Sequence, residues 1–194
     1  MTVRRALVAL CLAVSPAALA AAPVPKEQLL VPPADAAHYV VVSEAGKHGD
    51  EWRWTLSDGS LAYRESILLR GLVFEQDEVV KLDSSGKPVS FTIRGVTPSG
   101  DSAETFAIDQ ATARWKTTVD EGQAPAGQGV YNTFGGNFLA GDATIPLFLT
   151  AGAKGVDLLP SGRGTLERST TTFKAAGPQG TKTASLYFLK GIGQ

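Results

Sequence analysis

The chain contains very little sulfur and very little imidazole. Its 194 residues include one cysteine and two histidines, and the cysteine, Cys11, lies in the N-terminal segment that we expect to be removed. A mature chain without thiols forms neither disulfides nor thiolate metal sites. His38 and His48 could join Asp50 and Glu51 around a metal, but two histidines are not spaced on one strand as ligand pairs are. We therefore expect no metal site, no cofactor and no stoichiometric zinc.

The chain also lacks any concentration of positive charge. It has 18 basic and 19 acidic residues, and loss of Arg4 and Arg5 with the N-terminal segment leaves 16 against 19, or about −3. Lysine and arginine do not cluster, and the aromatic residues are not interleaved with them as in a groove for single strands. Nucleic acid is therefore excluded as the expected partner.

Long apolar runs are absent, apart from a short one near the N-terminus. Arg4 and Arg5 precede the apolar segment Ala6 to Val14, and small residues follow at Ala18 to Ala22. This pattern predicts a secretory signal peptide over residues 1–22, cleaved after Ala20 or Ala22. The apolar run is too short to span a bilayer as a mature helix. We therefore expect a periplasmic or secreted protein without a transmembrane segment after cleavage, the alternative being an uncleaved anchor.

The rest of the chain suits one domain that follows a short arm. Residues 23–37 are rich in proline, which removes amide donors and favours extended backbone, so they predict a surface arm. About 172 mature residues can bury a sufficient core without disulfides. Residues 38–194 are therefore expected to form a single antiparallel β domain. Because the sequence stops at KGIGQ without a closing element, we also expect the domain to be truncated at its C-terminal end.

Alternating apolar residues separated by short polar breaks indicate the fold class. In VSFTIRG, the residues Val89, Phe91 and Ile93 face one side of a strand, because side chains alternate along the backbone. The pattern predicts strands over residues 38–44, 50–56, 61–69, 73–83, 88–96, 102–108, 111–118, 164–174 and 181–189. A short helix is expected around residues 145–151. The fold class is thus mainly all-β: a strongly curved antiparallel meander or open half-barrel with one or two short helices.

Motifs that carry chemistry are missing. The nucleophile elbow GxSxG is absent. The segment GQGVYNTFGG at residues 127–136 resembles a phosphate-binding loop, but such a loop needs a β–α–β unit, which an all-β pattern lacks. Two acidic pairs, Asp77 with Glu78 and Asp101 with Glu104, have sequence numbers that differ by an odd number, so alternation does not place the two members on one face of a strand. We expect both pairs to be solvated strand edges. We therefore assign no catalytic residue.

One group of apolar residues is the candidate ligand-binding surface. Aromatic side chains are large and can line the inside of a curved sheet, or can simply form its core. The candidates, expected to share one face, are Trp52, Trp54, Phe91, Ile93 and Phe106.

Several short motifs together resemble a known family. They are Leu82-Asp83, the turn Gly86-Lys87-Pro88, Gly95 at a strand end, the strand Gly100 to Phe106, and Ala113-Arg114-Trp115. With LSDGSLAYRESILLRG before them, they resemble the leading β segment of exported amidohydrolase-family proteins of Gram-negative bacteria. In that family, the resemblance implies, a metal-dependent barrel follows, with an H-x-H among its ligands. This chain has no H-x-H, so no catalytic residue carries over.

Two hypotheses of function remain. In the first, the chain is a non-catalytic exported β module that supports or pairs with a hydrolase barrel not present in the chain, the whole being a metal-dependent amidohydrolase. In the second, it is a periplasmic carrier that binds an apolar small molecule or lipid in its curved sheet. We expect the chain not to be an enzyme on its own.

Overall fold

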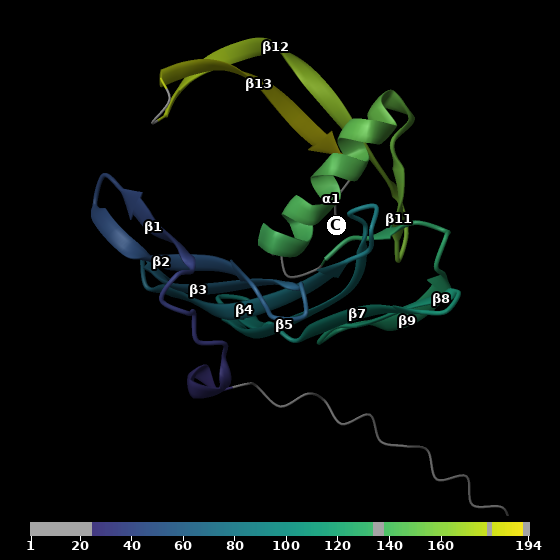
Figure 1. Cartoon of the computed structure of the whole chain (residues 1–194), viewed down its shortest axis with the longest axis horizontal. Helices are drawn as coiled ribbons and strands as arrows, with labels where there is room; N and C mark the ends of the chain where they lie inside the picture. The colour runs from purple at the N-terminus through teal and green to yellow at the C-terminus, as the bar shows by residue number, and fades with distance from the viewer. Residues whose placement is uncertain (1–24, 134–137, 178–179, 192–194) are drawn as a thin grey trace, which may run out of the picture.

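The computed structural model of the chain describes residues 25–133, 138–177 and 180–191 and is built mainly of β-strands (Figure 1). The prediction of a mainly all-β fold with a curved antiparallel sheet and a short helix is confirmed. Among the described residues, no helix is long and apolar enough to cross a membrane. The expected signal peptide, residues 1–22, lies outside the described residues.

The larger sheet, sheet A, is an antiparallel meander in which each strand follows its neighbour through a short turn. One such turn is closed by Asp83, whose Oδ1 accepts hydrogen bonds from the backbone amides of Ser85 and Lys87 at 2.8 and 3.0 Å. Its main strands, in spatial order, are β1 (Ala37–Ser43), β2 (Gly46–Thr55), β3 (Leu61–Leu69), β4 (Leu72–Leu82), β5 (Pro88–Thr97), β7 (Glu104–Asp109), β8 (Thr112–Lys116) and β9 (Glu121–Pro125). The two-residue strand β6 (Gly100–Asp101) also pairs with β5.

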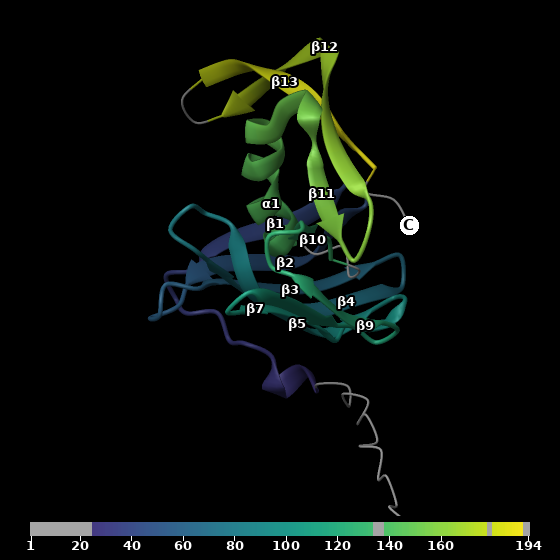
Figure 2. The same ribbon diagram turned by 90° about the vertical axis from the view of Figure 1, so that its right-hand side faces the viewer.

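The smaller sheet, sheet B, lies with the helix on the concave side of sheet A (Figure 1). Its strands are β10 (Val130–Tyr131), β11 (Val156–Leu159), β12 (Arg163–Gly177) and β13 (Gly180–Lys190). Helix α1 (Phe138–Ala151) stands between sheet A and the long β12–β13 pair, which arches over it (Figure 2). The 3-10 turns η1 (Lys26–Gln28) and η2 (Gly152–Lys154) complete the elements.

The expectation that the chain has no β–α–β unit is wrong. Strands β10 and β11 pair in parallel, and α1 connects them. A parallel pair needs such a crossover, because a tight turn can join only antiparallel strands. The glycine-rich segment 127–136 leads from β10 towards α1, but residues 134–137 lie outside the described part of the chain, so no phosphate site is assigned to it.

The core fills the space between the concave face of sheet A and sheet B. Aromatic and aliphatic side chains alternate along the central strands, so one side chain in two points inward. The main cluster consists of Tyr63, Val80, Phe91, Ile93, Phe106, Ala113, Trp115, Tyr131 and Leu159. Ala143 of α1 packs against this cluster, and Phe148 of α1 is 1% exposed. Helix α1 therefore packs on the concave side of the curved sheet A.

Candidate functional site

The register of sheet A divides the five candidate ligand residues between its two faces. Trp54 pairs with Ala62, while Arg53 pairs with Tyr63 of the core. Residues directly opposite each other in adjacent strands share a face. Trp52 and Trp54 therefore point away from the core, and the expectation that all five residues share one face is wrong.

Phe91, Ile93 and Phe106 are packed core. They are 3%, 1% and 4% exposed, and Tyr131 of β10 lies on the two phenylalanine rings at 5.4 and 5.0 Å between ring centroids. Aromatic pairs at this separation contribute stability beyond the area they bury. Tyr131 therefore packs on both phenylalanine rings, and all three candidate side chains are buried.

Trp52 and Trp54 lie half-buried on the convex face. The Trp52 ring stacks on His38 at 5.3 Å, and His38 Nε2 lies 2.7 Å from Asp50 Oδ1. Beside them is an open hollow of about 370 Å³. Its lining residues are Pro32, Pro33, Ala34, Ala36, His38 and Trp52.

The two histidines are held by separate partners. His38 contacts Asp50, whereas His48 Nε2 lies 2.6 Å from Ser43 Oγ. Within residues 25–133, 138–177 and 180–191, no three histidine, cysteine, aspartate or glutamate side chains are grouped so that they could hold a metal ion.

Carboxylates are buried on the concave face beneath α1. Glu65, Glu78 and Glu104 are 1%, 0% and 4% exposed. Glu65 accepts hydrogen bonds from the Tyr63 hydroxyl at 2.9 Å and from Gln76 Nε2 at 2.5 Å. Since a buried carboxylate is costly without such donors, this arrangement holds the Glu65 side chain in one position.

Burial dominates the acid–base behaviour of this face. It raises the pKa of Glu65, although the hydrogen bonds from Gln76 and Tyr63 act in the opposite direction. Burial also raises the pKa of the Tyr131 hydroxyl, and the negative charge of Glu104 raises it further. Both groups therefore favour their neutral forms relative to the same groups in water.

The acidic pairs singled out in the sequence are not solvated strand edges, so that expectation is wrong for three of the four residues. Asp77 is 1% exposed and Glu78 0%, and they point to opposite faces of β4 as alternation requires. Glu104 is buried, while Asp101 is exposed. Asp101 and Glu104 line one hollow of about 270 Å³, together with Thr97, Ser99, Ser102, Ala103, Thr117, Thr118 and Val119.

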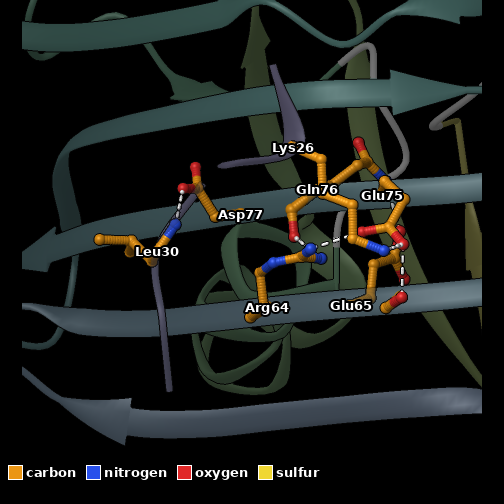
Figure 3. Close-up of polar contacts among 8 residues, drawn as sticks. Lys26, Leu30, Arg64, Glu65, Glu75, Gln76 and Asp77 are labelled. Atoms are coloured by element: carbon orange, nitrogen blue, oxygen red, sulfur yellow. Dashed lines mark hydrogen bonds and ion pairs between the residues drawn. The ribbon is translucent and has the colours of Figure 1, made fainter. Parts of the chain in front are cut away.

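The convex face of the central strands carries a network of ion pairs (Figure 3). Arg64 donates to Glu75 and, at 3.3 Å, to the carbonyl oxygen of Gln76. Arg94 Nε donates to Asp77 Oδ1 at 2.9 Å, and Arg94 also forms an ion pair with Asp77. Burial alone would raise the pKa of Glu75, but the hydrogen bonds that its carboxylate accepts hold it below its usual value.

The N-terminal arm covers this network. Lys26 Nζ lies 2.7 Å from Glu75 Oε1, and the backbone amide of Leu30 donates to Asp77 Oδ2 at 2.7 Å (Figure 3). Between them, Leu29 is 5% exposed. The arm therefore binds the sheet through polar contacts and buries Leu29, which the proline content alone did not predict.

A large apolar surface is exposed on the β12–β13 pair, which we call the ribbon (residues 163–190). Phe188 lies opposite Glu167, and Tyr187 opposite Arg168, so apolar side chains occur on both faces of the ribbon. The exposed large residues are Phe173, Leu186, Tyr187, Phe188 and Leu189, at 40–51%. Large apolar side chains that are exposed together on one element indicate an interaction site.

Comparisons with protein-family models, with curated proteins and with solved structures found no match to this chain.

Proposed function

We propose that the chain is an exported, non-catalytic β module whose ribbon packs against a hydrolase barrel outside this chain. The observation that carries the proposal is the ribbon itself, with five large apolar side chains 40–51% exposed. The nature of the partner rests on the sequence resemblance to the segment that precedes the barrel in exported amidohydrolase-family proteins.

The low stability expected of a two-stranded ribbon supports the binding of a partner surface to it. β12 pairs with β11 only at Arg163 and Gly164, and with β13 over residues 165–168 and 172–177. A hairpin of two strands is marginally stable in water unless a third strand or another surface covers its apolar side chains. Burial of exposed apolar area contributes roughly 25 cal/mol per Å². A second folded surface on the ribbon would therefore stabilise it.

The roles of the buried polar groups support a module without catalysis. Glu65 is held by Tyr63 and Gln76, and Asp77 by Arg94 and the arm. Each of these contacts satisfies a buried charge or dipole, as fold stability requires. The purified protein should therefore hold no stoichiometric zinc. One zinc per chain by elemental analysis, lost in a His38→Ala, His48→Ala double variant, would contradict this expectation.

The test begins with the coding sequence downstream of Gln194 and in the neighbouring genes, where a hydrolase barrel with an H-x-H should be found. Amide exchange of the ribbon is then measured with and without that barrel. We expect exchange in the ribbon to slow at least tenfold when the barrel is present. A Phe173→Ser, Phe188→Ser variant should lose this protection, whereas Val119→Ser, at a side chain 80% exposed elsewhere, should keep it. Unchanged exchange beside the barrel, or the absence of any encoded barrel, would overturn the proposal.

A carrier of apolar small molecules is the second candidate, and helix α1 favours it. Asp142 of α1 contacts Arg53 at 2.9 Å, and Arg53 lies 5.8 Å from the centre of the Tyr39 ring. Ile145 and Leu149, three and seven residues after Asp142, occupy the same side of the helix and are 42% and 52% exposed. This apolar side of the helix therefore lies on the side of Arg53 and stays partly exposed.

Titration with a fluorescent fatty acid separates the carrier from the module. A carrier should bind the probe in a saturable manner, and Leu149→Lys should weaken binding while Val119→Lys does not. Binding that is absent, or equal in both variants, would remove the carrier hypothesis.

A further inference from the structure

The two edges of sheet A differ in how they are protected. The β9 edge is short, begins at Glu121 and ends at Pro125, and charge and proline both discourage pairing with other chains. The β1 edge, AHYVVVS, contains no proline and no aspartate, glutamate, lysine or arginine. Among the described strands, β1 pairs only with β2. Its outer backbone groups are therefore available to another strand.

Three large apolar side chains of β1 are exposed. Tyr39, Val40 and Val42 are 51%, 47% and 67% exposed. The strand itself is regular, because the irregularity in its pairing lies on β2: Val41 pairs with Gly49 and Val42 with Lys47, which leaves His48 as the extra residue. A bulge on an edge strand would hinder pairing, but here the bulge is on the inner strand. β1 itself contains no extra residue, so its outer edge can pair residue by residue with a partner strand.

We propose that β1 pairs antiparallel with β1 of a second copy, with Val41 on the two-fold axis. In this register Val40 lies opposite Val42 of the second copy, and Tyr39 opposite Ser43. Pairing of the two strands joins the two sheets A into one continuous sheet. The surface is isologous, since both copies contribute the same residues. The proposal is independent of the hydrolase and carrier hypotheses.

Charge complementarity favours this register of the two strands. It also favours a second copy of the chain as the partner of the β1 edge. With Val41 on the axis, His38 lies opposite Glu44 of the second copy, the turn residue that directly follows β1, at both ends of the pair. His38 already contacts Asp50 through Nε2, so its Nδ1 is the atom that would meet the Glu44 carboxylate. With Val40 on the axis, Glu44 would instead lie opposite Ala36, without a positive partner. A histidine N–H and a carboxylate that face each other can form a hydrogen bond, which favours this pairing.

Size-exclusion chromatography with light scattering on the full chain tests the association. We expect a dimer that dissociates on dilution. Val42→Lys should weaken it about tenfold or more, since each dimer then carries two lysines opposite Val40. Val119→Lys is the control, at a side chain 80% exposed between β8 and β9. Urea melts should show that both variants fold like the parent. A monomer at all concentrations, or a dimer that Val42→Lys leaves unchanged, would overturn the proposal.

Disulfide formation tests the register. In a Cys11→Ala background, Val41→Cys should form an intermolecular disulfide under mild oxidation, because the two Cα atoms face each other within about 5.5 Å. Val40→Cys is the matched control: its two copies are offset by two residues along the pair, too far for a disulfide. Cross-linking through Val40 and not Val41, or a mixed complex with another protein in place of the dimer, would contradict the proposed pairing.

Discussion

Arg64 lies within the ion-pair network, and its side chain is 7% exposed. Removal of one partner of a buried pair leaves the other charge without compensation, which typically costs about 3–5 kcal/mol. We expect Arg64→Ala to lower the free energy of unfolding by about that amount in urea melts. Lys190→Ala is the control, because Lys190 and Glu167 are both about 60% exposed and such pairs contribute about 1 kcal/mol or less. Equal losses in both variants would mean that the buried pair is not formed.

Glu65 should make stability depend on pH in a defined direction. Because burial raises its pKa in the folded state, the stability that it contributes is fully present below its unfolded pKa of about 4.3. That stability is lost as the pH rises through the folded pKa. Glutamine cannot ionise, and its amide can still accept from Gln76 and donate to the Tyr63 hydroxyl oxygen.

Glu65→Gln should therefore gain stability relative to the parent protein as the pH rises from about 4 to about 8. Urea midpoints across that range measure the difference. Glu75, whose pKa is lowered, acts oppositely and loses its contribution at acid pH, but it does so in both proteins and cancels in the comparison. A difference between the two proteins that stays constant with pH would show that Glu65 does not titrate as its burial requires.

The faces of individual residues could be predicted only within a strand. Alternation identified Phe91 and Ile93 as neighbours on one face, and the structure confirms this. It could not relate Trp54 to Phe91, because their relation depends on the pairing of four strands. The ion pair of Asp77 with Arg94 could not be predicted for the same reason. The two residues are 17 positions apart and meet only through the register of β4 and β5.

At the scale of elements, the arm should contribute measurably to stability. Leu29 is 5% exposed, whereas Val31, two residues later, is 84% exposed. Leu29→Ala should cost about 2–5 kcal/mol, since both the apolar contact and the space it filled are lost. Val31→Ala should change stability by no more than about 0.5 kcal/mol. If urea melts gave the same small change for both, the arm would not be bound to the sheet in solution.

The predicted strands are present, but β9, β10 and β11 were not predicted, and the helix was predicted only in part. The strand predicted over residues 61–69 agrees with β3 at both ends, because alternation and polar turns define its limits. Helix α1 begins at Phe138, seven residues before its predicted start at Ile145. Gly141 and Pro146 lie within it, and both residue types disfavour helix interiors. Its position between the two sheets supplies the packing that the local sequence does not indicate.

The whole molecule divides into a central sheet that is covered on both faces and a ribbon whose large apolar side chains stay largely exposed. Strands β3, β4 and β5 carry the core cluster on one face and the arm with its ion pairs on the other. The ribbon exposes apolar side chains 40–51%. Since local opening is easiest where few buried contacts are lost, stability should be distributed very unevenly along the chain.

Amide hydrogen exchange on the isolated protein should therefore give the slowest rates in β3, β4 and β5, close to the rate set by global unfolding. Exchange should be fastest, among the strands, in β12 and β13, by several orders of magnitude, because a two-stranded hairpin is only marginally stable. Phe188→Ser should leave the free energy of unfolding of the central sheet, measured in urea melts, within about 0.5 kcal/mol of the parent. If the ribbon were instead protected as strongly as β4 in the isolated protein, its apolar side chains would already be covered. The ribbon would then need no partner to cover its apolar side chains.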